Sequence, residues 1–180
     1  MTATKVRVLD AAIDLAGTEG LRALTHARVD ERAGVPKGST SNYFRTRAAL
    51  LIGVADRILE RELPAVGSAF SPASAAELVD AFCDLFEFTT GVNRTLTTAR
   101  LVLFMEASHN AALRDALTRG RAAMEATALP VLAQLGARDP LAAGAAIAAC
   151  FEGLILHRIA RHDDADPRPI FDLVVRAALA

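Results

Sequence analysis

The chain has 180 residues, of which 52% are hydrophobic; 20 Lys and Arg residues face 21 Asp and Glu residues, so the net charge is -1. This length is sufficient for a buried core, and the charge balance excludes a uniformly basic nucleic-acid-binding protein. The 38 Ala residues and the single Tyr favour helices, because Ala has the highest helix propensity and strand-forming residues are scarce.

Helices in the first third of the chain are predicted from apolar spacing and from the residues that suit their ends. Thr25 and Thr46 suit the N-caps of two of them, and Gly34 separates two short ones. Pro36 suits the first turn of a helix, and Pro64 is expected to end one. The predicted helices span about 4–20, 26–33, 36–43 and 46–63.

The rest of the chain is predicted to form longer amphipathic helices, at about 75–90, 95–108, 110–135, 140–162 and 167–179. The third of these contains Pro130, where a bend is expected. No segment alternates apolar and polar residues over the length of a strand. The sequence therefore predicts an all-α fold of about nine helices, with three N-terminal helices followed by a larger helical domain.

Two short helices joined at Gly34-Val35 form the pattern of a helix-turn-helix, in which the second helix enters the major groove of DNA. The second helix and its flank read VPKGSTSNYFRTR, which contains no acidic residue and many hydrogen-bond donors. Helices of this length are not stable alone. An ordinary surface turn would therefore not explain why two of them follow each other with basic residues at their ends. The segment predicts a DNA-binding surface.

Residue types in this segment predict how it contacts DNA. Lys37, Arg45 and Arg47 are expected to neutralise phosphates, and Asn42 to pair with adenine. Gly38 lets the backbone approach the duplex, because it has no side chain. Further contacts to phosphates or base edges are predicted for the short polar side chains, for the N-cap of the first short helix and for a base on its next turn: Ser39, Thr40, Ser41, Tyr43, Thr25 and Arg28.

The stretch LTHARVDERAGVPKGSTSNYFRTRAALL resembles the N-terminal domain of the TetR family of transcriptional regulators. The shared features are a Thr opening the second helix, AGV at the turn, KGS at the start of the recognition helix, YF followed by a basic residue, and a Leu pair in the fourth helix. The rest of the chain is similar only in length, helix count and apolar character. The resemblance implies a homodimeric DNA-binding protein, usually a repressor, that leaves its operator when a small molecule enters the C-terminal domain.

Four residues depart from the family's pattern. Asp30 stands where the family usually has a small apolar residue between the two short helices, and Thr40 replaces a common Leu or Ile. Ser41 and Asn42 occupy positions where aromatic or His residues often touch phosphates. The phosphate contacts are therefore expected to depend more on Lys37, Tyr43 and Arg47.

Charge is distributed unevenly along the chain. Residues 1–47 contain eight basic and five acidic residues, a net +3, whereas residues 48–180 contain 12 basic and 16 acidic residues, a net -4. No acidic residue lies between Glu31 and Asp56, which provides the local positive field that a phosphate backbone requires. We predict a helix-turn-helix domain at 1–47 and a ligand-binding and dimerisation domain at 48–180.

The larger domain has more apolar side chains than one stripe per helix requires. Filling the core is the commoner role for each of them, but a subset is predicted to line a cavity for a small, apolar effector. The predicted lining residues are Phe82, Phe86, Leu101, Phe104, Met105, His109, Met124 and Phe151. A polar group on the effector would be held by one of His109, Glu106, Asp84, Glu152 or Cys83.

The last two helices are the predicted dimer surface, because both have broad apolar faces and the first is rich in Ala and Gly. The residues assigned to it are Ile147, Phe151, Leu154, Ile155, Ile170, Leu173 and Val174. Two-fold symmetry then predicts a palindromic operator in double-stranded DNA. Coupling between effector and DNA is expected to run through the fourth helix, which joins the two domains.

An enzyme is the main alternative of another class, and its support is one group of residues: His157, His162, Asp163, Asp164 and Asp166. The two His are five residues apart, whereas a metal is held by His pairs four apart on a helix, and there is no nucleophile motif or phosphate loop. We predict no enzymatic activity, no cofactor and no metal. A third interpretation, a helical dimer that binds a protein partner through a degenerate helix-turn-helix, requires Asp30 and Thr40 to disable the motif.

The location of the protein is predicted from what the sequence lacks. Asp10 and Asp14 interrupt the N-terminal stretch that a signal peptide would need to be apolar. The longest uncharged stretch, 140–151, is too short to span a bilayer. Cys83 and Cys150 are expected to be free thiols. We therefore predict a cytoplasmic protein without a membrane partner.

Overall fold

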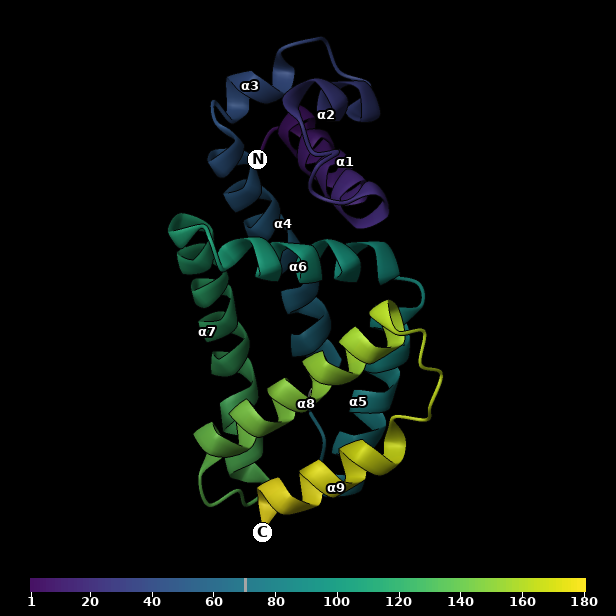
Figure 1. The fold of residues 1–180 in the computed structure, drawn as a ribbon. Coiled ribbons are helices and arrows are strands. Elements are labelled where there is room, and N and C mark those ends of the chain that lie inside the picture. The colour runs from purple at the N-terminus through teal and green to yellow at the C-terminus, as the bar shows by residue number, and fades with distance from the viewer. Residues whose placement is uncertain (70) are drawn as a thin grey trace. The chain divides into compact units, whose positions relative to one another are not determined.

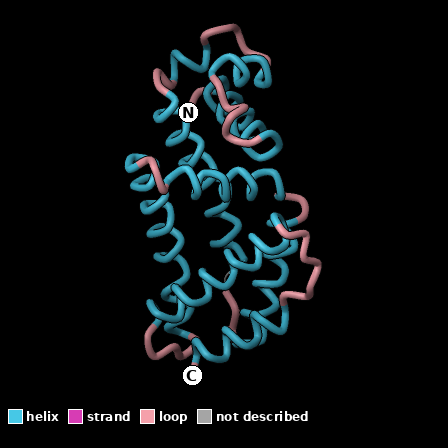
Figure 2. Tube along the Cα trace, in the orientation of Figure 1, coloured by secondary structure: helices cyan, strands magenta, loops and turns pink. Residues whose placement is uncertain are grey.

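The computed structural model describes residues 1–69 and 71–180, including all of their side chains except those of 65–69. In this part the chain forms helices joined by turns and loops, without a strand (Figures 1 and 2), which confirms the predicted all-α fold. The helices are α1 (Ala3–Glu19), α2 (His26–Ala33), α3 (Ser39–Tyr43), α4 (Arg47–Ala69), α5 (Ala75–Thr90), α6 (Arg94–Ala107), α7 (Ala111–Gln134), α8 (Pro140–Ala160) and α9 (Arg168–Leu179).

Two helix ends differ from the sequence prediction. Helix α3 begins at Ser39 instead of Pro36, because Gly38 has a left-handed conformation with φ of 91° and interrupts the helical backbone. Helix α4 continues through Pro64 to Ala69. A proline removes one backbone hydrogen bond and bends a helix, but it does not oblige the helix to end.

The chain divides into two compact units. The first contains Met1–Glu62 and Thr95–Gly120, and the second contains Leu63–Arg94 and Arg121–Ala180. Packing therefore does not follow the predicted boundary after Arg47, because much of α4, all but the start of α6 and the first part of α7 belong with α1–α3. The predicted division between DNA-binding and ligand-binding parts remains a functional prediction.

The first unit has a core built mainly from aliphatic side chains. Helices α1, α2, α4, α6 and α7 contribute buried residues that include Leu9, Ile13, Val29, Leu50, Val54, Leu103 and Leu113. A Cβ atom at Gly17 would lie 2.1 Å from the carbonyl oxygen of Thr95, so the glycine permits the close approach of α1 to the start of α6. This core supports the short helices α2 and α3.

The second unit is organised around α5, α8 and α9, which pack against one another in every pairing. Helix α7 joins them through its second half, where Leu132 is buried and a Cβ atom at Gly144 of α8 would lie 3.2 Å from Leu129. Phe82, Phe86 and Phe171 are buried at the centre of the unit. Aromatic packing thus replaces the aliphatic packing of the first unit.

Helix α8 has an unusually exposed apolar surface. It is the one helix among the described residues that is long and apolar enough to cross a membrane, by length and composition alone, and 17% of its most apolar window is buried. The uncharged stretch 140–151 is too short to span a bilayer, but the whole helix contains an 18-residue window of mean hydropathy 1.5. Much of the apolar surface of α8 is therefore exposed in this structure.

Candidate DNA-binding surface and effector-binding region

Helix α2 is fixed at both ends by capping interactions. The hydroxyl oxygen of Thr25 accepts a hydrogen bond from the Arg28 amide at 3.4 Å, which confirms the predicted N-cap. Gly34, with φ of 60°, ends the helix, and Nη2 of Arg7 on α1 donates to the carbonyl oxygens of Ala33 and Gly34 at 2.6 and 2.9 Å. These contacts hold α2 on α1 and set the start of the turn.

The hydroxyl groups of Ser39 and Ser41 bond to the backbone of the turn before α3. Oγ of Ser39 donates to the Pro36 carbonyl at 2.5 Å, and Oγ of Ser41 donates to the Gly38 carbonyl at 2.9 Å. Their protons are thus engaged within the protein, while their lone pairs remain able to accept a hydrogen bond. If these residues contact DNA, they are suited to accept from a base amino group.

Thr40 is the predicted contact that the structure contradicts. Its side chain is fully buried, with 0% exposure, and faces α2. Its backbone amide and its hydroxyl both donate to Oδ1 of Asp30, at 2.7 and 2.6 Å. A residue enclosed in this way has no surface with which to reach a base or a phosphate. Thr40 therefore positions α3 from inside the motif.

Asp30 is buried on α2, with 4% exposure, and its carboxylate bonds to the start of α3. Its Oδ2 accepts from the Gly38 amide at 2.7 Å, in addition to the two bonds from Thr40. Burial raises the pKa of this carboxyl, but the bonds from Thr40 and Gly38 and the charge of His26 lower the pKa further, so that it lies below its ordinary value. The carboxylate is therefore charged at neutral pH and fully engaged.

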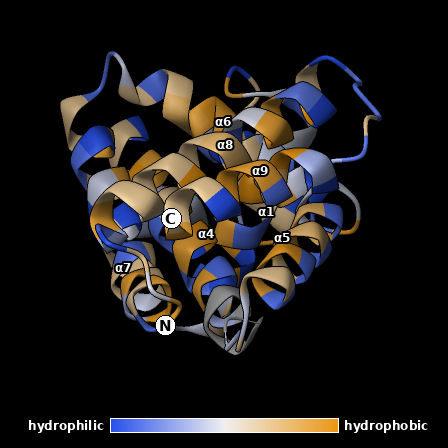
Figure 3. Ribbon diagram, turned by 90° about the horizontal axis from the view of Figure 1, so that it is seen from below, coloured by the Kyte–Doolittle hydropathy of each residue, from blue (hydrophilic) through white to orange (hydrophobic). Residues whose placement is uncertain are grey.

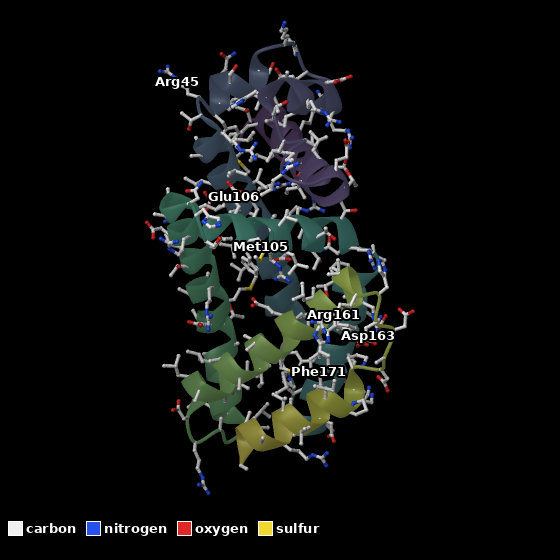
Figure 4. All side chains as sticks on the ribbon, in the orientation of Figure 1. Arg45, Met105, Glu106, Arg161, Asp163 and Phe171 are labelled. Carbon is white, nitrogen blue, oxygen red and sulfur yellow. The ribbon has the colours of Figure 1, made fainter. Side chains whose placement is uncertain are left out.

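The outward face of α3 and its flanks consists of exposed side chains, namely Lys37, Ser41, Asn42, Tyr43 and Arg45. Arg45 extends away from the ribbon into solvent (Figure 4). Phe44, which lies between these exposed residues, is turned into the core, and its carbonyl accepts a hydrogen bond from Nε2 of His26 at 2.6 Å. The segment thus presents its polar and basic groups on one side and its apolar group on the other.

Two of the predicted cationic contacts, Arg28 and Arg47, are exposed but have hydrogen-bond or ion-pair partners within the first unit. Arg28 forms an ion pair with Glu19 at 2.6 Å, and this bond is the largest cause of the lowered pKa of Glu19. Arg47 donates to the carbonyls of Leu24 and Leu21 at 2.6 and 2.8 Å, which ties the start of α4 to the loop between α1 and α2. Lys37 and Arg45 are therefore better placed than Arg47 to meet phosphates.

Four aromatic rings gather in the second unit: Phe82, Phe86, Phe151 and Phe171. Phe151 and Phe171 are stacked, with centroids 5.7 Å apart, and Phe171 also lies 5.6 Å from Phe82 and 6.1 Å from Phe86. The guanidinium of Arg158 lies over the Phe86 ring at 4.8 Å. Three of the four rings were among the predicted cavity-lining residues, and the structure brings them together.

Sequence reasoning missed Phe171, which is 1% exposed and the most buried of the four rings. Figure 4 labels it on α9. The signal was present, because Phe171 and the buried Val175 are four residues apart and define one face of α9. The predicted face of α9 used Ile170, Leu173 and Val174 instead. Helix α9 is apolar on two sides, and the pattern does not show which side faces inward.

The other predicted effector-binding residues are divided between the two units. Leu101, Phe104, Met105 and His109 belong to the first unit, and Met124 belongs to the second. Leu101, Phe104 and Met124 are half-buried, whereas His109 is exposed and Met105 is 73% exposed. Figure 4 labels Met105 on α6. A side chain as exposed as Met105 does not line an enclosed site in this structure.

The predicted dimer residues also divide by burial. Ile147 and Ile155 of α8 are buried inside their own unit and have little surface to offer a partner. Phe151, Leu154 and Val174 are half-buried. Figure 3 shows the apolar character of α8 and α9, and their exposed large apolar side chains are Leu141, Leu156, Ile170 and Leu173. Sequence reasoning did not include the first two of these in the dimer surface.

Comparison with protein families matches both parts of the chain. Residues 8–54 match "Bacterial regulatory proteins, tetR family", and residues 73–180 match "Tetracyclin repressor-like, C-terminal domain". The chain belongs to the TetR family. It is thus a transcription regulator with a helix-turn-helix DNA-binding domain and a ligand-binding domain, and not an enzyme. A comparison with curated proteins found no match.

Solved structures with the TetR fold match nearly the whole chain. A transcriptional regulator from Rhodococcus sp. Rha1 has 19% identity and a TM-score of 0.84, over 99% of this chain and 96% of its own. A TetR transcription regulator from Haloarcula marismortui has 15% identity and a TM-score of 0.84, over 100% of both chains. The multidrug binding protein EbrR, complexed with ethidium, has 23% identity and a TM-score of 0.73, over 97% of both chains.

The residues that suggested an enzyme lie at the end of α8 and in the loop that follows it. Among the described residues, no three His, Cys, Asp or Glu side chains lie close enough together to hold a metal ion. Arg158 donates to the carbonyls of Asp163 and Ala165 at 2.8 and 3.0 Å. The acidic segment after α8 is thus a connecting loop held by an arginine of α8. Burial raises the pKa values of Cys83 and Cys150, which makes these free thiols less reactive.

Proposed function

We propose that the protein is a homodimeric transcriptional repressor of the cytoplasm. Its two helix-turn-helix motifs bind successive major grooves of a palindromic operator, and a small, apolar effector bound by the ligand-binding domain releases them. Membership of the TetR family establishes the regulator and its two domains. The dimer, the operator symmetry, the direction of regulation and the effector class are what the proposal adds.

The observation that supports DNA binding most directly is the arrangement of α3. Asn42 and Tyr43 of α3 and the preceding Lys37 are exposed, while Thr40 of α3 and Phe44 at its C-cap are buried and anchor the helix to the core. Asn42 has the amide that pairs with adenine in a major groove, and Lys37 and Arg45 supply charge for the flanking phosphates. The anchored side fixes how these groups are presented.

The exposed apolar surface of α8 and α9 supports the dimer. Leu141 and Leu173 are more than half exposed, and Leu156 and Ile170 are nearly so. Exposed Ala residues separate the large apolar residues on α8, and a Cβ atom at Gly153 would meet nothing within 4 Å. Small residues allow a helix of a second subunit to approach closely, so two copies of α8 and α9 would bury this surface in a four-helix contact.

The aromatic cluster supports an apolar effector. Phe82, Phe86, Phe151 and Phe171 offer ring faces and edges in one region of the second unit, and the Arg158 guanidinium lies against one of them. EbrR, which has the same fold, binds the planar aromatic molecule ethidium. We propose an effector with an aromatic or extended apolar part, and coupling to the DNA-binding motif through α4, which contributes residues to both units.

The experiment that tests the repressor is a mobility-shift titration with the DNA flanking the protein's own gene and with an unrelated duplex of equal length. We expect tighter binding to the flanking DNA, two protomers per duplex and weaker binding as salt is raised. Equal binding to both duplexes would contradict an operator in that DNA. One protomer per duplex would contradict the palindrome.

A second experiment tests the effector class. Ethidium is a suitable first probe in the absence of DNA, with binding followed by calorimetry and by the shift in melting temperature. We expect binding to be weakened by Phe151→Ala, since Phe151 is half-buried and its ring belongs to the cluster, and unchanged by Phe88→Ala, which removes an exposed ring of α5. Equal weakening by both variants, or by neither, would contradict the assignment of the aromatic cluster to the effector.

A regulator that acts through a protein partner, with a degenerate helix-turn-helix, is the second candidate. It required Asp30 and Thr40 to disable the motif, but these two residues bond to each other and to the start of α3. No observation in the described part of the chain now favours this candidate. Failure to bind any flanking DNA would restore it.

A further inference from the structure

We propose that Asp30 is a positioning residue for DNA recognition, whose buried carboxylate caps the recognition helix α3 from the neighbouring helix α2. The inference rests on the proposed DNA-binding role of α3. A carboxylate near a phosphate backbone would ordinarily weaken DNA binding by charge repulsion. We infer that Asp30 strengthens binding instead, because it holds the recognition helix in place.

Helix α3 is too short to be stable without contacts from outside it. In a helix of five residues, Ser39–Tyr43, the few hydrogen bonds do not offset the free-energy cost of nucleation. Its first amides also have no partners within the helix. The N-cap residue is Gly38, which has no side chain and so cannot satisfy those amides itself. The cap must therefore come from elsewhere in the chain.

Asp30 supplies this cap across the turn. Its Oδ2 accepts from the Gly38 amide at 2.7 Å, and its Oδ1 accepts from the Thr40 amide at 2.7 Å. The donors are eight and ten residues later in the sequence, so the bonds fix the position of α3 relative to α2 as well as satisfying the amides. A negative charge at a helix N-terminus also interacts favourably with the amide dipoles.

Thr40 completes the arrangement. Its hydroxyl donates to Oδ1 of Asp30 at 2.6 Å from a position with no exposure to solvent. A Leu or Ile at position 40 would leave the carboxylate with one donor fewer, and a small apolar residue at position 30 would leave the Thr40 hydroxyl buried without an acceptor. The two departures from the family pattern are therefore one compensating pair.

The consequence for recognition follows from the neighbouring residues. Ser41 and Asn42 come directly after Thr40 in α3 and are exposed. Because the Asp30–Thr40 contact fixes the first turn of the helix, it also fixes the direction in which Asn42 presents its amide. Lys37 and Arg45 lie outside α3 and depend less on its capping. Loss of the cap should therefore reduce discrimination between DNA sequences more than the attraction to phosphates.

The test compares Asp30→Asn with Glu31→Gln, which removes the same charge from the next residue of α2. Glu31 is exposed and serves as the matched control. In a mobility-shift titration with the DNA upstream of the protein's own gene, we expect Asp30→Asn to bind about tenfold more weakly than the wild type, the effect of losing one charge-assisted hydrogen bond. Glu31→Gln should bind as tightly as the wild type or slightly more tightly, because a repulsive charge is removed.

Two further readouts separate positioning from a general loss of stability. Asp30→Asn should retain the wild-type salt dependence of binding, whereas its preference for the upstream DNA over an unrelated duplex should fall by about the same tenfold factor. A smaller change at the other end of the contact provides a variant with an intact Asp30. Thr40→Ser should retain wild-type binding, because it keeps the hydroxyl, and Thr40→Val should lose affinity and preference as Asp30→Asn does.

Several outcomes would overturn the proposal. Equal binding by Asp30→Asn and Glu31→Gln would show that the carboxylate does not position α3. Equal losses for Thr40→Ser and Thr40→Val would show that the hydroxyl bond is irrelevant. In the DNA-free wild type, fast hydrogen exchange at the Gly38 and Thr40 amides would show that the cap does not form, even if Asp30→Asn fails to fold. A wild type that prefers no flanking DNA would instead contradict the proposed repressor.

Discussion

Arg45 and Arg47 are two residues apart in a basic segment, but their guanidinium groups have different surroundings. Both side chains are exposed, but Arg47 donates to two backbone carbonyls in the loop between α1 and α2, whereas Arg45 extends away from the ribbon into solvent (Figure 4). The first arrangement stabilises the fold of the first unit, and the second leaves the charge available to a phosphate. Residue type alone assigned the same role to both.

This difference predicts distinct effects of two matched substitutions. Arg45→Gln should leave the melting temperature unchanged, weaken DNA binding and reduce the slope of log affinity against log salt by about 1. Arg47→Gln should lower the free energy of unfolding by about 1 kcal/mol, because the bonds to Leu21 and Leu24 are lost. Thermal unfolding and salt-dependent mobility shifts measure the two effects. The same salt slope for Arg45→Gln and the wild type would contradict the assigned phosphate contact.

Asp30 also predicts a dependence of stability on pH. The pKa of its carboxyl lies below the ordinary value of 3.8 in the folded protein, so the charged form stabilises the fold above about pH 4. That contribution is lost as the pH falls through the lowered pKa. The free energy of unfolding should therefore differ most between wild type and Asp30→Asn at neutral pH, and the difference should shrink below pH 4.

Urea unfolding of both proteins between pH 3 and pH 7 measures this difference directly. Other carboxylates titrate in the same range, Glu19 among them, but they are common to both proteins and cancel in the comparison. A difference that stays constant down to pH 3 would show that the Asp30 carboxylate does not titrate with a lowered pKa.

At the scale of the element, α9 shows how far a hydrophobic pattern determines structure. The sequence predicted this helix and its end near Leu179, and the structure confirms both. It did not predict which apolar side is buried, because Phe171 and Val175 lie on one side while Ile170 and Leu173 lie on another. Apolar periodicity identifies an amphipathic helix only when one side alone is apolar.

The same helix provides a test of its two sides. Phe171→Ala should lower the free energy of unfolding by about 3–5 kcal/mol, because it removes a buried ring that packs against three others. Leu173→Ala, on the exposed side, should cost far less in the monomer at low protein concentration. Chemical denaturation of both variants measures these values. Similar costs for the two would show that the sides of α9 are assigned wrongly.

In the short helices α2 and α3, the local ends could be predicted from the sequence, but the polar contacts between the helices could not. Helix α2, its Thr25 cap and the turn at Gly34 follow from local rules that the sequence displays. The bonds from Asp30 to α3 do not, since a pattern of residue types does not show which buried polar groups meet across a turn. Asp30 and Thr40 each looked like a defect in the motif, and only their distances show that each satisfies the other.

At the scale of the whole molecule, the modest positive charge of the DNA-binding part and the exposed apolar surface of α8 and α9 both favour a dimer. The first 47 residues have a net charge of +3, which is modest for a DNA-binding domain, and the rest of the chain is negative. Two DNA-binding motifs on one duplex double the number of phosphate contacts, so affinity should depend on dimerisation. The exposed apolar residues of α8 and α9 provide the surface on which that dimerisation is proposed.

The proposed dimer predicts that one exposed residue controls both assembly and DNA binding. Leu173 is 65% exposed, so Leu173→Glu should leave the fold of the monomer intact while placing a charge in the subunit contact. Sedimentation should show a dimer for the wild type and a monomer for Leu173→Glu. Val92→Glu is a suitable control, because Val92 is 92% exposed in the turn after α5, outside the proposed surface.

The monomeric variant should bind the upstream DNA at least tenfold more weakly and with about half the salt slope of the dimer, because each binding event then contacts one half-site. A Leu173→Glu protein that remains dimeric, or a monomer that binds DNA as tightly as the wild type, would show that α9 does not form the contact that joins the two DNA-binding motifs.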